Sequence, residues 1–373
     1  MSLAVYVALF AAMILPFAHR RAETTIRPPE KPGVSVTYVA FLDARRLMVA
    51  YGSWEAGRLP GQVGVWDVRT GRQERLLLPQ VPDLRAVAVS PDGLRMATGG
   101  LFSNTLQVWD LREHKPVATL TSDPYAQFAF SQEGRTLALI TEQPRIEFPH
   151  IEVDLYALPS GTMRPLEGSE GTTALAFSPA GPILAIALAQ YHRPFVLGGD
   201  NPLTAQVRLL DTTTGQAART LEGGNALIRW LVFSQDGQRL AACCAGGTIR
   251  VWSAGTGNLL QTVKEEGVSP FVGGPGLQGA APIAFSPDGH RLASALNAGQ
   301  LSLWNLDTAS LEKTFRNRSP WALLLNCAFS ADGKTLAVGG TNGCVWVWDI
   351  ASGRLKRRWT LKCPPQELRP HAP

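Results

Sequence analysis

The sequence predicts an all-β protein: a seven-bladed β-propeller of four-stranded antiparallel blades, preceded by a short N-terminal hydrophobic helix. Three observations predict the ring. One short phrase recurs seven times, a second phrase follows each copy, and short β-rich runs bounded by turn residues alternate between them. The composition agrees, because 36 glycines and 27 prolines occur in a chain that is 45% hydrophobic and only 17% charged.

The first phrase is an apolar residue followed by Ser-x-x-Gly. It starts at Val89, Phe130, Phe177, Phe233, Phe285 and Phe329, with a degenerate copy at Phe41. In "SPDG" the proline presets φ, Asp suits the next position, Gly takes the left-handed conformation, and Ser bonds backbone amides. The copies "SQEG" and "SPAG" lack the Asp, and only one copy carries a histidine, His290. We therefore interpret the Ser, Asp and His of "FSPDGH" as turn geometry and reject a catalytic set.

The second phrase ends a strand with a position that we call the Trp slot. It is occupied by Trp66, Trp109, Tyr156, Leu210, Trp252, Trp304 and Trp348. In the second copy the β-rich runs are 85–89, 94–99, 105–109 and 116–120, which gives four strands per unit. Such a unit has two apolar faces and cannot bury both alone. Closing the copies into a ring buries them and leaves only short edges exposed.

These repeats resemble those of the WD40 family of β-propellers. The family's named motif stands as "VWD" at Val65, Val108 and Val347, and the "FSPDG" turns resemble repeats of the bacterial type. The resemblance covers residues 34–361. It implies a seven-bladed propeller that serves as a binding platform.

The repeats also depart from the family pattern. Gly168-Ser169 and Gly223-Gly224 stand where the family has Gly-His, and the Asp usual before the Trp is replaced by Ser103, Gly246, Ala298 and Asn342. We therefore expect the buried polar network that these residues build in the family to be largely missing. Packing of Trp and aliphatic side chains would then hold the blades together.

Residues 1–18 form a hydrophobic segment without charge, followed by His19, Arg20 and Arg21. Its 17 uncharged residues from Ser2 to Ala18 would span about 25 Å as a helix, at the short limit for a bilayer. With basic residues on its C-terminal flank, we expect a single-pass anchor with the propeller on the cytoplasmic side. A cleaved signal peptide that exports the protein, and a wrongly assigned start, are the alternatives. Residues 19–33 read as a Pro-rich tether and 362–373 as a Pro-rich tail.

Motifs for chemistry are absent from the sequence. The six histidines show no metal-ligand spacing, and there is no phosphate-binding loop or nucleophile elbow. The five cysteines show no regular spacing, and Cys243 and Cys244 should point to opposite faces of a strand. We expect no cofactor, no metal and no catalysis. An enzyme or small-ligand site at the mouth of the central channel stays open, because such a site leaves no linear motif.

Long insertions distinguish one end of the predicted ring from the other. Residues 51–62, 141–150, 189–206 and 264–280 all fall in second-to-third-strand loops or in a connection between blades, which share one end. Insertions that cluster on one face of a repeat protein often mark its binding face. The aromatic, Arg and His residues there are the candidate contacts for a protein or peptide partner: Tyr51, Trp54, Arg58, Arg145, Phe148, His150, Tyr191, His192, Arg193, Phe195 and Phe271. For any one of them, pinning its own loop is an equal alternative.

The net charge of +5 is modest, but five basic residues fall within 354–362. Binding to nucleic acid or anionic lipid through this run is a weaker alternative; protection of an exposed edge strand explains it better. We expect a monomeric propeller. The same run can supply the outer strand of the last blade, which leaves open whether "ETTIR" at 23–27 adds a further strand.

Overall fold

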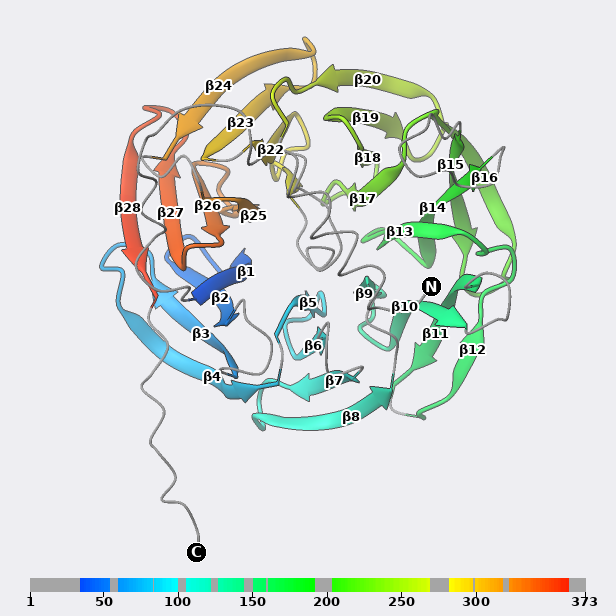
Figure 1. Cartoon of the computed structure of the whole chain (residues 1–373), viewed down its shortest axis with the longest axis horizontal. Helices are drawn as coiled ribbons and strands as arrows, with labels where there is room; N and C mark the ends of the chain where they lie inside the picture. The colour runs from blue at the N-terminus through cyan, green and yellow to red at the C-terminus, as the bar shows by residue number, and fades with distance from the viewer. Residues whose placement is uncertain are drawn as a thin grey trace, which may run out of the picture.

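The computed structural model describes residues 34–53, 60–82, 84–99, 105–121, 127–143, 150–158, 160–191, 203–268, 282–297, 299–317 and 322–361. Within these ranges 28 strands form seven four-stranded sheets, arranged as blades around a central axis (Figure 1). Every strand pairing is antiparallel, and every sheet follows the chain order outward from the axis. The predicted seven-bladed propeller is thus confirmed.

The blades are contiguous segments of the chain. Blade 1 is β1 (Val34–Phe41), β2 (Arg46–Ser53), β3 (Gly61–Asp67) and β4 (Gln73–Val81); blade 2 is β5 (Ala86–Val89), β6 (Arg95–Gly99), β7 (Thr105–Asp110) and β8 (Lys115–Thr121). Blade 3 is β9 (Phe128–Phe130), β10 (Thr136–Gln143), β11 (His150–Ala157) and β12 (Met163–Pro165); blade 4 is β13 (Thr172–Phe177), β14 (Ile183–Tyr191), β15 (Leu203–Asp211) and β16 (Ala217–Gly224). Blade 5 is β17 (Ile228–Phe233), β18 (Arg239–Cys244), β19 (Thr248–Ser253) and β20 (Leu259–Lys264). Blade 6 is β21 (Ile283–Phe285), β22 (Arg291–Asn297), β23 (Gln300–Asn305) and β24 (Ser310–Arg316); blade 7 is β25 (Leu324–Phe329), β26 (Thr335–Gly340), β27 (Cys344–Asp349) and β28 (Leu355–Thr360).

The hydrophobic core is divided among the junctions between blades. Alternate residues of each strand face the two neighbouring blades, so seven apolar clusters form, one at each junction. Cys243 and Cys244 illustrate the alternation, because Cys243 packs between blades 5 and 6 and Cys244 between blades 4 and 5. Their predicted opposite orientations are confirmed, and burial raises the pKa of the Cys244 thiol to about 11.

The ring closes between blades 7 and 1 without a shared strand. The basic run supplies β28, as predicted, and all four strands of blade 1 lie within Val34–Val81. Closure rests on packing: a Cβ at Gly339 would lie 2.4 Å from Cγ1 of Val36, so only glycine admits that contact. Across the same seam, the Val39 amide donates to Oδ1 of Asn326 at 3.1 Å. "ETTIR" lies outside the described residues.

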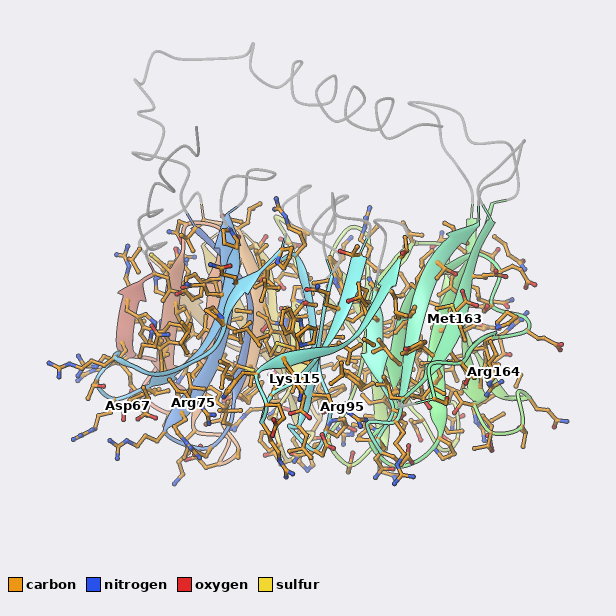
Figure 2. The ribbon with its side chains drawn as sticks, turned by 90° about the horizontal axis from the view of Figure 1, so that it is seen from below. Asp67, Arg75, Arg95, Lys115, Met163 and Arg164 are labelled. Atoms are coloured by element: carbon orange, nitrogen blue, oxygen red, sulfur yellow. The ribbon has the colours of Figure 1, made fainter. Side chains whose placement is uncertain are left out.

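A basic side chain bridges each junction to the next blade. Five come from the outer strands, at the position that pairs with the residue before the Trp slot. Arg75 lies 2.7 Å from Nε2 of His114, Arg164 donates to the carbonyl of Thr212, Arg219 to Thr256 (2.9 Å), Lys313 to Ile350 and Ala351 (2.7 and 2.9 Å) and Arg357 to Arg69 (2.6 Å). Figure 2 shows Arg75 and Arg164 on the outer wall.

Blades 2 and 5 use a different bridge. Their outer strands have Ala118 and Gln261 at the bridging position. There, the arginine that follows the Ser-x-x-Gly turn reaches the next blade instead: Arg95 donates to the Gly134 carbonyl at 2.7 Å and Arg239 to that of Gly289 at 2.8 Å (Figure 2 for Arg95). These interblade bridges were not predicted. The sequence does carry a signal that could have predicted four of them. A basic residue stands nine positions after the Trp slot at Arg75, Arg219, Lys313 and Arg357.

The polar network that the family builds from His and Asp was expected to be largely missing, and blade 6 has a different buried network, which was not predicted. Glu265, from the connection after β20, is only 4% exposed and receives hydrogen bonds from Ser294, Ser302 (2.8 Å) and Asn297 (3.0 Å). Ser294 in turn accepts from Nε1 of Trp304 at 3.0 Å. The carboxylate of Glu265 thus supplies the buried acceptor, where the sequence analysis considered only the His and Asp positions of the family pattern. In blade 3, Ser169 similarly donates to the Leu166 carbonyl and accepts from the Val153 amide.

The predicted N-terminal helix and membrane anchor lie in residues 1–33, outside the described residues. In the part of the chain that is described, every regular element is a strand. Among those residues, no helix has the length and apolar character needed to cross a membrane.

Candidate functional site

The two ends of the ring differ in loop length. At one end the Ser-x-x-Gly turns separate the first two strands of blades 2 to 7 by an identical interval, and a turn one residue shorter does so in blade 1. At the other end, β2 and β3, β10 and β11, β14 and β15, and β20 and β21 are separated by the predicted insertions. We call these ends the turn face and the inserted-loop face. The strand order therefore places the strand ends that flank all four insertions on one face.

The strands extend further into the insertions than the sequence suggested. Tyr51 pairs with Gln62 in the β2–β3 ladder, Gln143 pairs with His150, and Tyr191 pairs with Leu203. These residues were assigned to loops and belong to strands instead. The antiparallel ladders continue because pairing satisfies backbone groups that a loop would leave to water.

Tyr51 is buried in the apolar cluster between blades 7 and 1. It is 4% exposed, its ring meets the Trp66 ring edge-on at 5.7 Å between centroids, and its hydroxyl donates to Gln62. In this position Tyr51 supports the β2–β3 hairpin, which is the alternative role considered for each candidate. His150 begins β11 and Tyr191 ends β14, so both stand on the inserted-loop face. The remaining candidates lie outside the described residues: Trp54, Arg58, Arg145, Phe148, His192, Arg193, Phe195 and Phe271.

Both ends of the described chain also lie at the inserted-loop face. Val34 pairs with Ser53, beside the first insertion. A Cβ at Gly343, in the β26–β27 turn, would lie 2.9 Å from the Val34 carbonyl oxygen and 3.3 Å from that of Leu361. The chain therefore enters and leaves the ring at neighbouring points on this face.

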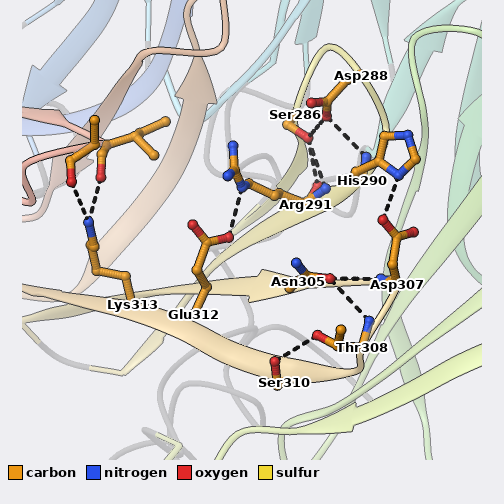
Figure 3. Close-up of polar contacts among 12 residues, drawn as sticks. Ser286, Asp288, His290, Arg291, Asn305, Asp307, Thr308, Ser310, Glu312 and Lys313 are labelled. Atoms are coloured by element: carbon orange, nitrogen blue, oxygen red, sulfur yellow. Dashed lines mark hydrogen bonds and ion pairs between the residues drawn. The ribbon is translucent and has the colours of Figure 1, made fainter.

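The turn face is built from backbone geometry. Ser286 donates to Asp288 and accepts from the Arg291 amide at 2.9 Å, and Ser90, Ser234 and Ser330 repeat this arrangement (Figure 3). The hydrogen bond from Ser286 lowers the pKa of the Asp288 carboxyl. The His290 ring points to Asp307 of the neighbouring hairpin, at 2.8 Å, and not to Ser286 (Figure 3). The Ser and Asp of this phrase thus serve the turn, and the His ring contacts the neighbouring hairpin.

A cavity of about 450 Å³ occupies the channel between blades 1 to 5. Its walls are the innermost strands, and it extends to Pro179 and Gln235 in two turns of the turn face. The described residues that line it are apolar except for Tyr38, Gln127, Ser234 and Gln235. Gln127 links the inner edges of neighbouring blades, because its amide donates to the Arg229 carbonyl at 2.9 Å and its oxygen accepts from the Leu175 amide at 3.4 Å. Within the described chain no three His, Cys, Asp or Glu residues lie close enough together to hold a metal ion.

The basic run lies on the outer wall beside the ring closure. Arg354 precedes β28, and Lys356, Arg357 and Arg358 are exposed within it. Lys356 forms an ion pair with Asp349 at 3.0 Å, and Arg357 is the bridge to blade 1. Trp359 lies against Gly71 of the β3–β4 turn, with 3.7 Å to where a Cβ would stand. Lys362 lies outside the described residues.

Comparisons with known proteins agree with this architecture. The family model described as "WD domain, G-beta repeat" matches residues 80–110, 215–253 and 312–349. Three segments of the chain thus match this repeat. Each match ends at the "VW" strand of a blade, in blades 2, 5 and 7. Together with the relatives described next, these matches support the WD40 β-propeller family.

Relatives with WD repeats cover most of the ring. The chain is 24% identical over 330 residues to periodic tryptophan protein 2 of Arabidopsis thaliana, which covers 81% of the chain. It is 24% identical over 316 residues to a guanine nucleotide-binding protein subunit beta of Oryza sativa subsp. japonica, covering 79% of the chain and 76% of that relative. Autophagy-related protein 16 of Arabidopsis thaliana is 26% identical over 245 residues, which are 64% of the chain and 42% of that protein. The chain spans only 33% of periodic tryptophan protein 2.

Proposed function

We propose that this protein is a non-catalytic scaffold that docks a protein or peptide partner on its inserted-loop face. The observation that carries the proposal is the difference between the two faces. One has short turns of nearly uniform length, and the strand ends that flank every predicted insertion lie on the other. The WD-repeat relatives support a protein-interaction scaffold.

Candidate contacts on this face are the aromatic and Arg side chains of the insertions, the residue types that dominate interface energetics. Tyr51 is buried, so its contribution would be to fix the β2–β3 hairpin that presents Trp54 and Arg58. The tether at 19–33 and the segment 1–18 precede Val34, which also lies on this face. If 1–18 anchors the protein in a membrane, the inserted-loop face is the one directed toward it. Cytoplasmic placement and a bacterial type of repeat are further parts of this proposal.

The test is site-specific photo-crosslinking in cells that express the full chain. A photoreactive phenylalanine analogue at Trp54 or Phe271 samples the inserted-loop face, and the same analogue at Arg112 or Gln235 samples the turn face. We expect the first pair to capture a partner that the second pair does not. The Trp54→Ala and Arg193→Ala variants should weaken that capture at least tenfold, whereas Arg112→Ala should leave it unchanged.

Capture from both faces alike, or capture insensitive to Trp54→Ala and Arg193→Ala, would exclude the inserted-loop face as the docking surface. The anchor is tested separately by carbonate extraction. Release of the full-length chain into the supernatant would argue against a spanning segment, whereas retention in the membrane pellet supports the anchor.

A further inference from the structure

The outer edge of β28 differs from those of the other blades. An outermost strand has one edge without a strand partner, and such edges invite pairing with other chains unless they are protected. In this ring β4, β8 and β12 carry Pro79, Pro116 and Pro165, and β16 ends in two glycines. Proline and glycine weaken a strand as a template for pairing. Among the described outer strands, β20, β24 and β28 contain neither.

Charge separates β28 from β20 and β24. The segment Arg354–Thr360 contains Arg354, Lys356, Arg357 and Arg358 and no acidic residue, and we call these four residues the basic edge. By contrast, β24 includes Glu312, which pairs with Arg291 at 2.7 Å, and β20 has only Lys264. Within the described chain, no carboxylate lies within ion-pair distance of Arg354, Arg357 or Arg358.

The charges of the basic edge select its partner. Two copies of β28 would repel each other, since like charges placed opposite in adjacent strands are destabilising. An incoming strand of acidic residues would instead be attracted by these charges. Its main-chain hydrogen bonds to the edge would supply affinity, and the charge pairs would supply selectivity. We propose that β28 accepts an acidic, extended peptide segment of a partner protein as a fifth strand of blade 7.

Features of the surrounding wall favour a peptide over a nucleic acid or a membrane. Trp359, the aromatic residue of β28, lies against Gly71 and is only partly exposed, so its ring is not a stacking platform for a base. Leu355, 47% exposed, is the single large apolar side chain exposed on this strand, too little for insertion into lipid. The unpaired strand edge is the feature that only a peptide uses.

The edge is also held in place for pairing. Arg357 donates to the Arg69 carbonyl at 2.6 Å, and Lys356 pairs with Asp349. These two side chains fix β28 against blade 1 and against its own hairpin. Among the described residues, Arg358 donates only to Sγ of Cys344, at 3.6 Å, so the charges of Arg354 and Arg358 remain for the partner. The surface is separate from the inserted-loop face, so the protein could hold two partners at once.

The experiment is fluorescence anisotropy with a labelled peptide of alternating Glu and Val, matched to β28 in length. Three probes accompany it: the same peptide N-methylated at alternate amides, a Lys-Val analogue, and an oligothymidine of equal charge. Vesicles of phosphatidylcholine with phosphatidylserine are tested by flotation. The full chain is compared with the double variant Arg354→Glu/Arg358→Glu and with Arg316→Glu, which reverses a charge on the outer strand of blade 6. The interblade bridges stay intact in both variants.

We expect micromolar binding of the acidic peptide that weakens at least tenfold in the Arg354→Glu/Arg358→Glu variant and by less than twofold in Arg316→Glu. N-methylation should weaken binding as strongly as the double variant, because it blocks the strand edge without changing charge. Binding that survives N-methylation overturns strand addition. Tighter binding of the oligothymidine or the vesicles overturns the peptide as the partner. Thermal unfolding of both variants confirms that the ring remains folded, and a failure here leaves the inserted-loop proposal untouched.

Discussion

Blades 2 and 6 hold their central tryptophan in the same way but place it in different electrostatic surroundings. In both, the indole N–H donates to a hydroxyl on the second strand: Trp109 to Thr98 at 2.8 Å and Trp304 to Ser294 at 3.0 Å. In blade 6 that hydroxyl is bonded in turn to the buried carboxylate of Glu265. The difference shows that one repeat can be held by a simple hydroxyl and another by a network whose strength depends on a buried charge.

The largest expected effect comes from removing that carboxylate. Glu265→Ala leaves the hydroxyls of Ser294 and Ser302 and the Asn297 amide without their acceptor inside the core. We expect a loss of about 3 kcal/mol in the free energy of unfolding, measured by urea denaturation. Glu266→Ala, at the exposed neighbouring position, should change it by less than about 0.5 kcal/mol. Equal effects would show that the network contributes nothing.

A smaller effect distinguishes the two hydroxyls. Ser294→Ala removes the group that joins Trp304 to Glu265, and we expect a loss of about 2 kcal/mol. Thr98→Val in blade 2 deletes a single hydrogen bond at nearly constant volume, and we expect about 1 kcal/mol. The comparison between the blades fails if urea denaturation gives Thr98→Val the larger loss.

The pH dependence of blade 6 follows from its carboxylate. Burial raises the pKa of Glu265 above the ordinary value of 4.5, with the three donors acting in the opposite direction. A raised pKa in the folded state means that its contribution to stability is fully present below pH 4.5 and is lost as pH rises through the folded pKa. Glu265→Gln keeps an acceptor without this titration. The difference in melting temperature, variant minus wild type, should therefore increase from acid to neutral pH; a constant difference would contradict it.

The smallest expected effects concern the bridges from these blades to their neighbours. Blade 6 uses Lys313 on its outer strand, and blade 2 uses Arg95 after its turn. Replacing either by Met removes a partly exposed hydrogen bond to a carbonyl, and each should lower the free energy of unfolding by about 0.5 to 1 kcal/mol. In the double variant the two losses should add, because the junctions are far apart on the ring. A single variant that unfolds the ring at room temperature would show the bridges to be far stronger.

Much of the fold could be predicted because the repeat phrases carry it. Turn residues and the Trp slot recur at nearly fixed intervals, so the strands of blade 2 and the outer strand β28 were located within a residue or two. Strand ends within insertions were not, since Tyr51 and Tyr191 carry no turn signal and pairing across the ladder decides where they lie.

The polar features were missed for a related reason. Glu265 lies in an insertion, outside the repeated phrases, so nothing in the repeat indicates that it folds beneath Ser294 and Ser302. The position of the bridging residue depends on strand register. Most outer strands contain a bulge beside the Trp slot, which puts the bridging residue nine positions after it. Strand β12 of blade 3 pairs without a bulge, so its bridging residue comes one position earlier. Counting from the Trp therefore finds Arg219 and Arg357 but not Arg164. Of the candidate contacts on the inserted-loop face, the structure places the strand-borne ones, Tyr51, His150 and Tyr191, and the rest stay predictions.

The seam between blades 7 and 1 has a further consequence for the order of the chain. Because no blade combines strands from both ends, and Val34 and Leu361 lie beside Gly343, a short linker could join the two ends without disturbing a sheet. New termini could then be opened at any connection between blades. Circular permutation would thus give rings with the same seven blades and chain ends at different angular positions, each still on the inserted-loop face.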